Sequence, residues 1–362
     1  MTGLLSADDP ADFQRWNALV DAAPTPDIYY RPGYARAYQA EGEGKAIALH
    51  VETADAAFLL PLLLRPLSKL PFVPDDTAQD AITPYGYGGL LWLHSSQPTP
   101  AQLRAGLTAL ADWCKSHDVI SILLRLHPLL EQDRWLAPLA GPGLSVHIFG
   151  PTTAIALDPW SEASMRKGRR SDLGVARRSL RITWSSSTGP SPGAPSMPDA
   201  LSLFRSLYEA AMDRLGAAAF YHFPPSYYVA LGEGVGDRMA VALAWSGDQP
   251  VGGSIFLADR RFAHYHLSAT NDTGRKSKAT TLLIREGIDW ARARGCRQLH
   301  LGGGVRGDDS LFDFKKGFGG EVHQYAFAGL ICDPARYQAL LAARLAHSGA
   351  PPRPDYFPAY RA

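Results

Sequence analysis

The chain is poor in cysteine and contains no long apolar run. Its only cysteines are Cys114, Cys296 and Cys332, which are widely spaced and form no CxxC pair. This spacing predicts neither a disulfide framework nor a zinc site, so we expect three small core residues and no metal site. No apolar run approaches the roughly 20 residues of a membrane-spanning helix. The first residues, MTGLLSADDPADF, lack the basic and apolar regions of a secretory signal, which predicts a cytoplasmic protein.

An excess of charge of either sign is also absent. The formal net charge is +1. Proteins that coat nucleic acid neutralise many phosphates with clustered cations, so this balance argues against that class and leaves room only for a local basic patch. Lysine is scarce relative to arginine: only 8 of the 36 lysine and arginine residues are lysines. The pKa of a lysine responds strongly to burial, so a lysine in an arginine-preferring chain is a candidate for chemistry.

One lysine lies in the most informative stretch of the chain, residues 299–320. Three consecutive glycines, 302–304, follow an apolar strand pattern, and the sequence Phe314-Lys315-Lys316-Gly317-Phe318 comes soon after. A tight turn beside a lysine flanked by aromatic rings suits a site that holds an anionic or carbonyl-bearing group. The alternative is a solvated edge with a charge pair. Asp308 and Asp309 either accept a proton or cap the next turn, and aspartate at helix starts favours capping.

The pattern of elements repeats along the chain. In the second half, antiparallel strands over 238–245, 251–258 and 262–269 precede a helix over 279–294 and a strand over 298–301. In the first half, strands over 46–52, 57–64 and 82–93 precede a helix over 101–116 and a strand over 119–126. Because the order is the same, we predict an internal duplication of one α/β fold.

The chain resembles the FemABX-like peptidoglycan aminoacyltransferases of the wider GNAT superfamily. The resemblance rests on the loop TPYGYGG at 83–89, RLHP at 125–128, a basic helix, YHLSAT at 265–270, and LGGG followed by SLFDFKKGFGG. It implies an α/β fold with α+β mixed sheets, made of two tandem GNAT-like acyltransferase domains and a C-terminal helix that returns to the first domain. We expect these domains at 1–150 and 151–332, with the C-terminal helix and tail at 333–362.

The resemblance also implies a reaction. Family members transfer an amino acid from aminoacyl-tRNA to the amino group of a peptidoglycan precursor's stem peptide, so we expect that acyl donor and no cofactor. The precursor is either lipid-linked (lipid II) or nucleotide-linked (UDP-MurNAc-peptide). We expect a monomer without a transmembrane segment, in peripheral contact with the membrane. By the same resemblance, Lys315 and Phe314 contact the donor end and stabilise charge on the reacting carbonyl.

Other site residues follow from the same comparison. Arg214 corresponds to an arginine that the family sets against the precursor's diphosphate, although a solvated helix-end cation fits it equally well. Tyr38 stands where the family often has a lysine, and Arg36 is near enough in sequence to replace that contact. Tyr85 and Tyr87 lie in the glycine-rich loop, where they either face the ligand or form the aromatic edge of a hairpin.

A dense basic stretch over 166–181 includes Arg170. It suits phosphates of tRNA or of a lipid-linked precursor, although such runs are more often solvated helix faces. Lys276 and Lys278 lie in NDTGRKSKAT at 271–280, where acyl-CoA-dependent GNAT enzymes carry paired glycines that cradle a pyrophosphate. The absence of these glycines argues against CoA as the donor, while the two lysines remain candidates for phosphate contacts. A CoA-dependent N-acyltransferase and a non-catalytic binding scaffold are the remaining alternatives.

Overall fold

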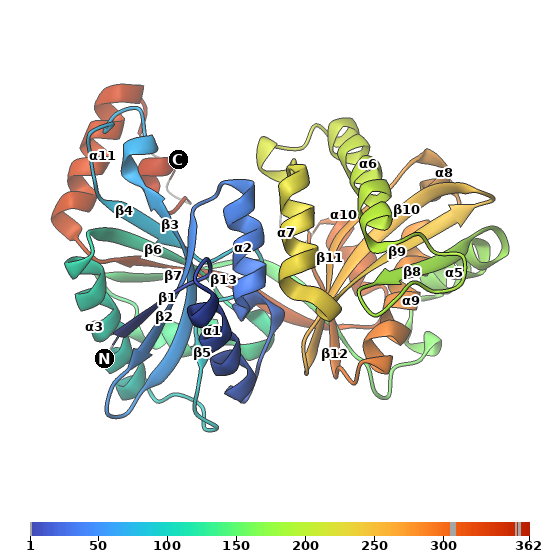
Figure 1. The fold of residues 1–362 in the computed structure, drawn as a ribbon, viewed down its shortest axis with the longest axis horizontal. Helices are drawn as coiled ribbons and strands as arrows, with labels where there is room; N and C mark the ends of the chain where they lie inside the picture. Colours follow the sequence, from blue (N-terminus) through green and yellow to red (C-terminus); the bar gives the residue numbers. More distant parts are fainter. Residues whose placement is uncertain (1, 305–308, 352, 354–355) are drawn as a thin grey trace. The chain divides into compact units, whose positions relative to one another are not determined.

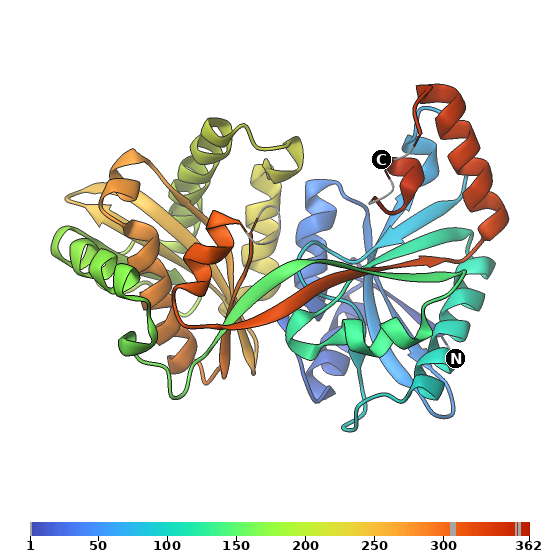
Figure 2. The ribbon, with the colours of Figure 1, turned by 180° about the vertical axis from the view of Figure 1, so that it is seen from behind.

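The computed structural model describes residues 2–304, 309–351, 353 and 356–362. The chain divides into two compact units. Unit 1 comprises Met1–Phe149 and Gln324–Ala362, and unit 2 comprises Gly150–His323 (Figure 1). The chain passes from one unit to the other within two strands, β7 (Leu144–Ala156) and β13 (Glu321–Ile331) (Figure 2). Within the described part of the chain, no helix combines the length and apolar character needed to cross a bilayer.

Unit 1 is a mixed sheet with helices. Its strands are β1 (Thr2–Ser6), β2 (Lys45–Glu52), β3 (Ala57–Pro66), β4 (Gln79–Ile82), β5 (Leu91–Trp92), β6 (Val119–Arg125) and most of β13. Its helices are α1 (Pro10–Ala22), α2 (Pro32–Glu41), α3 (Pro100–Ser116), α4 (Gln132–Leu136) and α11 (Pro334–Ser348). The strand order is β1-β2-β3-β4-β6-β13, and β5 pairs with β3. Neighbours are antiparallel except β4 and β6, which are parallel.

Unit 2 has the same plan. Its strands are β7, β8 (Arg181–Ser186), β9 (Met239–Ser246), β10 (Gln249–Ala258), β11 (Phe262–Thr270) and β12 (Gln298–Gly303). Its helices are α5 (Lys167–Ser179), α6 (Met197–Leu215), α7 (Pro225–Val235), α8 (Asp272–Lys276), α9 (Ala279–Ala293) and α10 (Ser310–Lys316). The strand order is β7-β12-β11-β10-β9-β8, and among the described strands of this unit the single parallel pair is β11 with β12.

The two units therefore repeat one topology, as the order of elements in the sequence predicts. In each, an antiparallel meander is followed by a helix (α3 or α9), and the helix returns the chain to a strand parallel to the meander's last strand. Parallel neighbours require such a crossover connection, whereas the meander needs only short turns. The prediction of a mixed α/β fold is confirmed.

One predicted strand is wrong. The segment expected as a strand over 82–93 pairs only at its ends, in β4 and β5. Gly86 and Gly89 have φ angles of 112° and 79°, in a region that side chains disfavour, and Pro84 has no N–H to donate. The residues between the two strands therefore form a loop.

Local sequence sets the helix boundaries. Thr99 and Gln102 form a reciprocal capping box at the start of α3, and Pro100 occupies its first turn. Ser196 caps α6, which ends at Gly216 with a φ of 59°. The chain leaves α9 through Gly295, with a φ of 75°, as its position after the apolar pattern predicts.

Each unit has its own hydrophobic core. In unit 1, β2, β3 and β6 pack against α3 around Phe58, Leu110 and Ile122. In unit 2, α9 covers one face of the sheet with Leu283 and Ile288, while α6 covers the other. The neighbouring glycines of β10 mark these two faces: a Cβ at Gly252 would lie 3.3 Å from Ala279 of α9, and one at Gly253 would lie 3.0 Å from Phe204 of α6.

The C-terminal segment packs within unit 1. Tyr337 and Leu340 of α11 share a small buried cluster with Tyr360. The Tyr360 hydroxyl lies 2.8 Å from Ser121 Oγ and donates to Asp80 Oδ2 at 3.1 Å. Asp80 is completely buried and also pairs with Arg65 and with Arg361. The Asp80 carboxylate thus ties the last residues of the chain to β3 and β4, and the Tyr360 hydroxyl ties them to β6.

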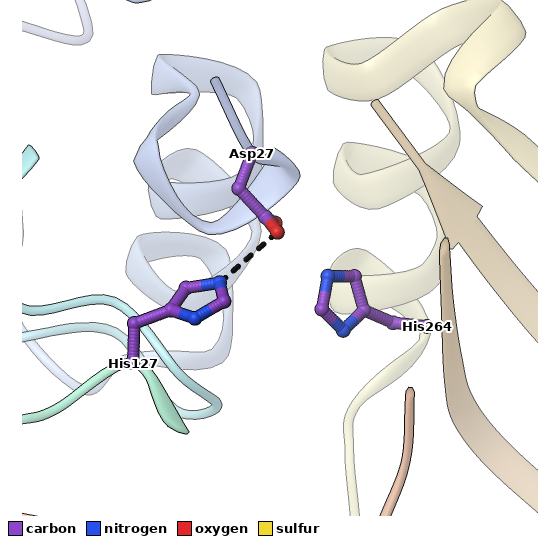
Figure 3. A group of neighbouring side chains, drawn as sticks. All are labelled: Asp27, His127 and His264. Carbon is purple, nitrogen blue, oxygen red and sulfur yellow. Dashed lines mark hydrogen bonds and ion pairs between the residues drawn. The ribbon is translucent and has the colours of Figure 1, made fainter. Parts of the chain in front are cut away.

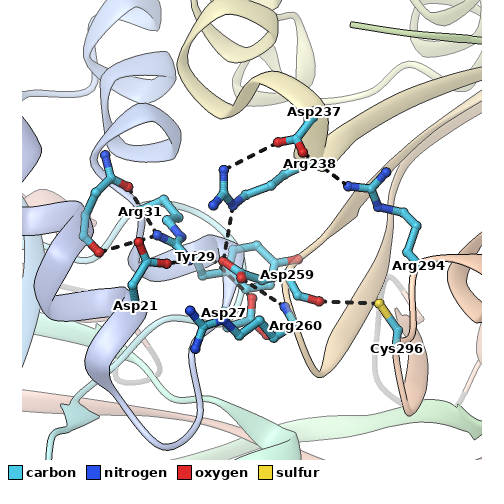
Figure 4. A network of polar contacts seen from close by, with 11 residues as sticks. Asp21, Asp27, Tyr29, Arg31, Asp237, Arg238, Asp259, Arg260, Arg294 and Cys296 are labelled. Carbon is cyan, nitrogen blue, oxygen red and sulfur yellow. Dashed lines mark hydrogen bonds and ion pairs between the residues drawn. The ribbon is translucent and has the colours of Figure 1, made fainter. Parts of the chain in front are cut away.

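Ion pairs with one buried partner also connect elements within each unit, and Figure 4 draws two such groups. In unit 1, Arg31 pairs with Asp21 at 2.8 Å. In unit 2, Arg238 lies 3.7 Å from Asp259, and the Cys296 thiol donates to the Asp259 carbonyl oxygen at 3.3 Å. The three cysteines form no disulfide; Cys114 and Cys296 are buried core residues as expected, whereas Cys332 is partly exposed.

Candidate active site and substrate-binding residues

Lys315 lies in the last turn of α10, which follows β12 in unit 2. Its side chain is largely buried, with 9% of the residue exposed. The Nζ ammonium donates a hydrogen bond of 2.8 Å to the carbonyl oxygen of Gly303, the last residue of β12. It also lies over the ring of Tyr265 on β11, 6.0 Å from the ring centroid. The solvated edge, the alternative that the sequence left open, does not describe this lysine.

Burial changes the protonation of this lysine. Removal from water disfavours the ammonium and lowers the pKa of Lys315 to about 8, against a smaller opposing effect of Asp309. Near neutral pH the side chain is therefore mostly protonated, but it gives up its proton far more readily than an exposed lysine. The unfolded chain keeps this proton up to its pKa of 10.5, whereas the folded chain releases it near pH 8. The free energy of unfolding therefore rises with pH between about 8 and 10.5, and Lys315 adds no further change above that range.

The start of α10 is fixed by a cap. Asp309 accepts hydrogen bonds from the backbone N–H groups of Leu311 and Phe312, at 3.0 and 2.9 Å. The capping interpretation of Asp309 is confirmed, and the carboxylate also satisfies donors that a helix start leaves unpaired. Asp308, the other predicted candidate, lies outside the described residues.

Phe314 and the turn after Lys315 are held by α5 and the residues before it. The Phe314 ring meets Phe318 edge-on at 5.5 Å, and the Arg169 guanidinium lies 4.7 Å from the Phe314 ring centroid. Trp160 Nε1 donates to the Phe318 carbonyl oxygen at 2.7 Å. Arg166 pairs with Asp313 at 2.7 Å. Two cations of the basic stretch, Arg166 and Arg169, therefore contact the lysine-bearing helix.

Gly319 makes this turn sensitive to substitution. Its φ is 82°, and a Cβ built there would lie 2.4 Å from the carbonyl oxygen of Ser164. We expect Gly319→Ala to lower the free energy of unfolding by about 2 to 4 kcal/mol, because a left-handed backbone strain is added to a main-chain clash. Chemical denaturation would measure the loss.

Gly349 provides a matched control for this substitution. It has a similar φ of 67°, but nothing lies within 4 Å of the position of its Cβ. Gly349→Ala should cost only about 1 kcal/mol. Equal losses in the two variants would contradict the role assigned to the contact with Ser164.

The parallel pair β11–β12 separates close to Lys315. Phe262, Ala263 and His264 pair with Gln298, Leu299 and His300. Both strands then continue, β11 to Thr270 and β12 to Gly303, with no further pairing between them in the described part of the chain. Tyr265 and Gly303, the two contacts of the Lys315 ammonium, both follow the point of separation. The lysine therefore lies where β11 and β12 part from each other, with one contact on each strand.

The other predicted cations of unit 2 lie at several places. Arg214, in the last turn of α6, is exposed and donates to the Thr270 carbonyl oxygen at 3.1 Å. Lys276 ends α8 and is exposed. Lys278 has a φ of 63° and lies 3.7 Å from Asp172 of α5. Arg170 donates to the carbonyl oxygens of Ala163 and Met165, so its guanidinium is engaged by the main chain.

Tyrosines gather around the TPYGYGG loop of unit 1. The ring of Tyr38, which is fully buried on α2, lies 6.4 Å from that of Tyr85. Tyr87 meets Tyr325 edge-on at 5.0 Å. The Tyr34 hydroxyl donates to the Tyr85 carbonyl oxygen at 2.7 Å and so holds the loop against α2. The structure brings Tyr38 and Tyr85 together.

Arg36 points elsewhere. It is exposed and lies over the Phe13 ring of α1, at 5.6 Å from the centroid. The cation beside the tyrosines is Arg125, at the end of β6, whose guanidinium lies 5.7 Å from the Tyr85 ring centroid and 3.7 Å from Glu43 Oε1. Its side chain also donates to the Thr83 carbonyl oxygen.

Two carboxylates near Arg125 were not among the residues that sequence reasoning singled out. Burial and the neighbouring Glu43 raise the pKa of Glu41 to about 7. Glu41 and Glu43 flank the glycine that ends α2, a position that carries no recognisable motif. Arg125 belongs to the RLHP segment, which could have directed attention to it. His127 of the same segment is completely buried and pairs with Asp27 at 3.1 Å (Figure 3).

Comparisons with known proteins show what the domain and the fold resemble. Residues 164–316 match the family model of the acetyltransferase (GNAT) domain. No curated protein matches the chain. The matched segment of unit 2, which includes Lys315, is therefore similar in sequence to a GNAT acetyltransferase domain.

Solved structures resemble the chain over most of its length. The structure of FemX has a TM-score of 0.67 at 15% identity and covers 90% of this chain and 98% of its own. The C-terminal domain of a putative lysylphosphatidylglycerol synthetase from Agrobacterium fabrum has a TM-score of 0.57 at 11% identity, with coverages of 92% and 96%. A tandem GNAT protein from the clavulanic acid biosynthesis pathway has a TM-score of 0.50 at 12% identity, with coverages of 92% and 99%. The predicted resemblance to FemABX-like proteins is confirmed at the level of the fold.

Proposed function

We propose that this protein transfers an amino acid from aminoacyl-tRNA to the amino group of a peptidoglycan precursor's stem peptide. The support is the combination of a GNAT-type acyltransferase domain with a whole-chain fold like that of FemX. The precursor is lipid-linked or nucleotide-linked, and the reaction would take place in the cytoplasm, where charged tRNA is found. A monomer in peripheral contact with the membrane suits either precursor.

The observation that carries the proposal is the setting of Lys315. A lysine ammonium has three N–H donors, and the hydrogen bond to Gly303 uses one of them. Because the ammonium is largely buried, its attraction for a developing negative charge is weakened less by water than at the surface. The point where β11 and β12 stop pairing with each other lies beside it. These features suit stabilisation of a carbonyl oxygen that gains charge.

The chemistry required is aminolysis of an ester. The acceptor nitrogen attacks the ester carbonyl carbon and forms the C–N bond, and the C–O bond to the terminal ribose of the tRNA breaks. The ribose oxygen leaves with the proton that the nitrogen loses. Because an ester is already activated, the protein's main tasks are to hold both reactants in attack geometry and to stabilise the carbonyl oxygen. Lys315 supplies the second, while the ring of the preceding residue, Phe314, packs against Phe318 and Arg169 and so helps to hold the helix that carries the lysine.

The remaining predicted residues are assigned to binding. In unit 2, Arg214 is proposed for precursor phosphate, and the exposed Lys276 and Lys278 for phosphates of the donor. Arg170 is a weaker candidate, since main-chain oxygens engage its guanidinium. In unit 1, Tyr38, Tyr85 and Tyr87 offer rings and hydroxyls to the precursor. Arg125 is a better candidate than Arg36 for the cation among them, because it lies against Tyr85.

A second candidate is acyl transfer from acyl-CoA. The matched family model is that of an acetyltransferase domain, and it spans the turn at 271–280. The structure of the clavulanic acid pathway neighbour is described as being without AcCoA, a description that names this donor only as absent. Against this candidate, the turn lacks paired glycines, and Lys278 occupies the left-handed conformation that glycine adopts without strain.

The deciding experiment offers a pool of charged tRNAs together with lipid-linked and nucleotide-linked precursors and follows product mass. We expect the precursor to gain the mass of one amino acid residue. Phosphatidylglycerol vesicles form a second acceptor arm, since one neighbour is named as a lysylphosphatidylglycerol synthetase. Amine-dependent thiol release from acetyl-CoA without incorporation from tRNA would replace the proposal with the CoA candidate.

The pH dependence of the transfer rate tests the protonated form of Lys315. Only the ammonium stabilises the carbonyl oxygen, and its pKa is about 8. The ratio of the wild-type rate to the residual rate of Lys315→Arg should therefore be constant below pH 7 and fall about tenfold for each pH step above 8. Titration of the acceptor amine cancels in this ratio, because it affects both proteins equally. A ratio that stays flat to pH 10 would contradict the assigned form.

A further inference from the structure

We propose that Tyr265 is a positioning residue for Lys315, holding the ammonium with the face of its ring while Ser254 and Ser268 hold its hydroxyl. The inference deepens the proposed function, because the transfer reaction gives a fixed ammonium its use. The arrangement itself involves unit 2 alone.

The ring and a carbonyl oxygen hold the same ammonium. Lys315 Nζ lies 6.0 Å from the Tyr265 ring centroid and donates to Gly303 O at 2.8 Å. The negative face of an aromatic ring attracts a cation within about 6 Å, and the attraction strengthens when water is excluded. Gly303 belongs to β12 and Tyr265 to β11, so the lysine side chain from α10 joins both strands beyond their last pair. Its position is thus specified from two directions.

The orientation of the ring is fixed by hydroxyl groups. Ser268 and Ser254 lie within interaction range of the Tyr265 hydroxyl and oppose part of the effect of burial on its pKa. Ser254 Oγ donates to Ser268 Oγ at 3.0 Å, and Ser268 Oγ also contacts the Gly253 carbonyl oxygen at 3.2 Å. Burial raises the pKa of Tyr265 to about 12, so the hydroxyl stays neutral throughout the working range. Such a tether is what distinguishes a positioned ring from one that merely fills space.

An irregularity in the strands brings these groups to one face. Ile255 pairs with Leu267, but Phe256 pairs with Tyr265, so β11 contains one extra residue at His266. In regular pairing, Tyr265 and Ser268 would project from opposite faces, because side chains alternate. The bulge puts both on the face of Ser254 and Phe256. Bulges commonly re-aim a side chain in this way next to active sites.

Other charges around Lys315 do not replace this contact. Asp309 caps α10 and acts on Lys315 from the start of its own helix. Asp313, exposed on α10, pairs with Arg166 of α5 and lies 4.0 Å from Lys316. The Arg169 guanidinium faces Phe314. Of these groups, only Asp309 has a resolved effect on the lysine, which leaves the ring and the Gly303 oxygen as its nearest described supports.

The test measures the titration of Lys315 directly. Eight lysines are few enough for their ε-carbon signals to be resolved by NMR after isotopic labelling, and Lys315→Arg identifies the signal of Lys315. Tyr265→Phe keeps the ring, and pentafluorophenylalanine introduced at position 265 keeps the shape but removes the negative face. We expect the pKa of Lys315 to fall by about 0.5 to 1 in the fluorinated variant relative to Tyr265→Phe. Fluorination should also move the upper limb of the transfer rate's pH profile downward by the same amount.

Two further comparisons separate the contribution of the Tyr265 ring from that of its hydroxyl. Tyr265→Leu should lower the transfer rate at pH 7 about tenfold with less than a twofold change in KM, while Tyr265→Phe should broaden the Lys315 signal with little change in its pKa. Identical Lys315 titrations in the phenylalanine and pentafluorophenylalanine proteins would overturn the inference. The titration requires no substrate, so it stands even if the proposed transfer is not observed. Conversely, transfer without any effect of the ring would refute this role and leave the proposed function intact.

Discussion

Lys315→Ala is expected to reduce amino acid transfer by about 100- to 1,000-fold. The substitution removes the ammonium proposed to stabilise the carbonyl oxygen, and loss of one such donor has an effect of this size. The free energy of unfolding should change little. Removing the side chain loses packing contacts, but it also removes a buried charge, whose burial is unfavourable. Single-turnover transfer from charged tRNA, together with thermal unfolding, would measure both effects.

Lys316 is the matched control for this prediction. It is the next residue on α10 and bears the same charge, but its side chain is 33% exposed and lies 4.0 Å from Asp313. Lys316→Ala should change the transfer rate by less than about threefold, since a partly solvated ion pair contributes little. Wild-type activity in Lys315→Ala, or equal losses in both variants, would remove Lys315 from the proposed mechanism.

Asp80→Ala is expected to lower the free energy of unfolding of unit 1 by about 3 to 5 kcal/mol. The carboxylate is completely buried and accepts from Arg65 Nε at 2.7 Å and Arg361 Nε at 2.5 Å. Its removal leaves two largely buried guanidinium groups without their counter-ion. An uncompensated buried charge is strongly destabilising. The Tyr360 hydroxyl also loses an acceptor. Urea unfolding monitored by fluorescence would give the change.

Glu209 is the matched control for Asp80. It is an ion-paired carboxylate that is not buried, so it separates the effect of burial from the effect of losing a charge. It forms an ion pair with Arg205 at 3.3 Å along α6, and its side chain is 41% exposed. Glu209→Ala should cost no more than about 0.5 kcal/mol. If Asp80→Ala were as mild, the network would not fasten the C-terminal segment as described. Limited proteolysis of Asp80→Ala should, by contrast, release residues after α11 first.

The elements of the second half were predictable because local signals agreed there. The apolar periodicity over 279–294 and the glycine at 295 both indicate α9, and the structure ends that helix at Ala293. The loop between β4 and β5 was misread as a strand, because apolar residues on both sides concealed the effect of Pro84 and two glycines. Local pattern was sufficient where every signal pointed the same way.

The candidate site was only partly predictable. Lys315 and Phe314 stood out through composition and spacing, and Tyr38 and Tyr85 through the resemblance. Tyr265 could not be given its role from sequence, because strand alternation would separate it from Ser268. Arg125 and Glu43 are 82 positions apart in the chain, and no motif in the intervening sequence indicates that their side chains lie close together.

The order of strands and helices, the repeated plan and the unusual lysine were determined by the sequence alone, since hydrophobic period, turn residues and composition are local properties of a chain. The burial of that lysine, the bulge that turns a tyrosine toward it, and the carboxylate that fastens the final residues were decided by tertiary structure. These features depend on which groups lose contact with water together. That loss is set by the packing of distant segments, and it changes the energies of charges more than any local preference does.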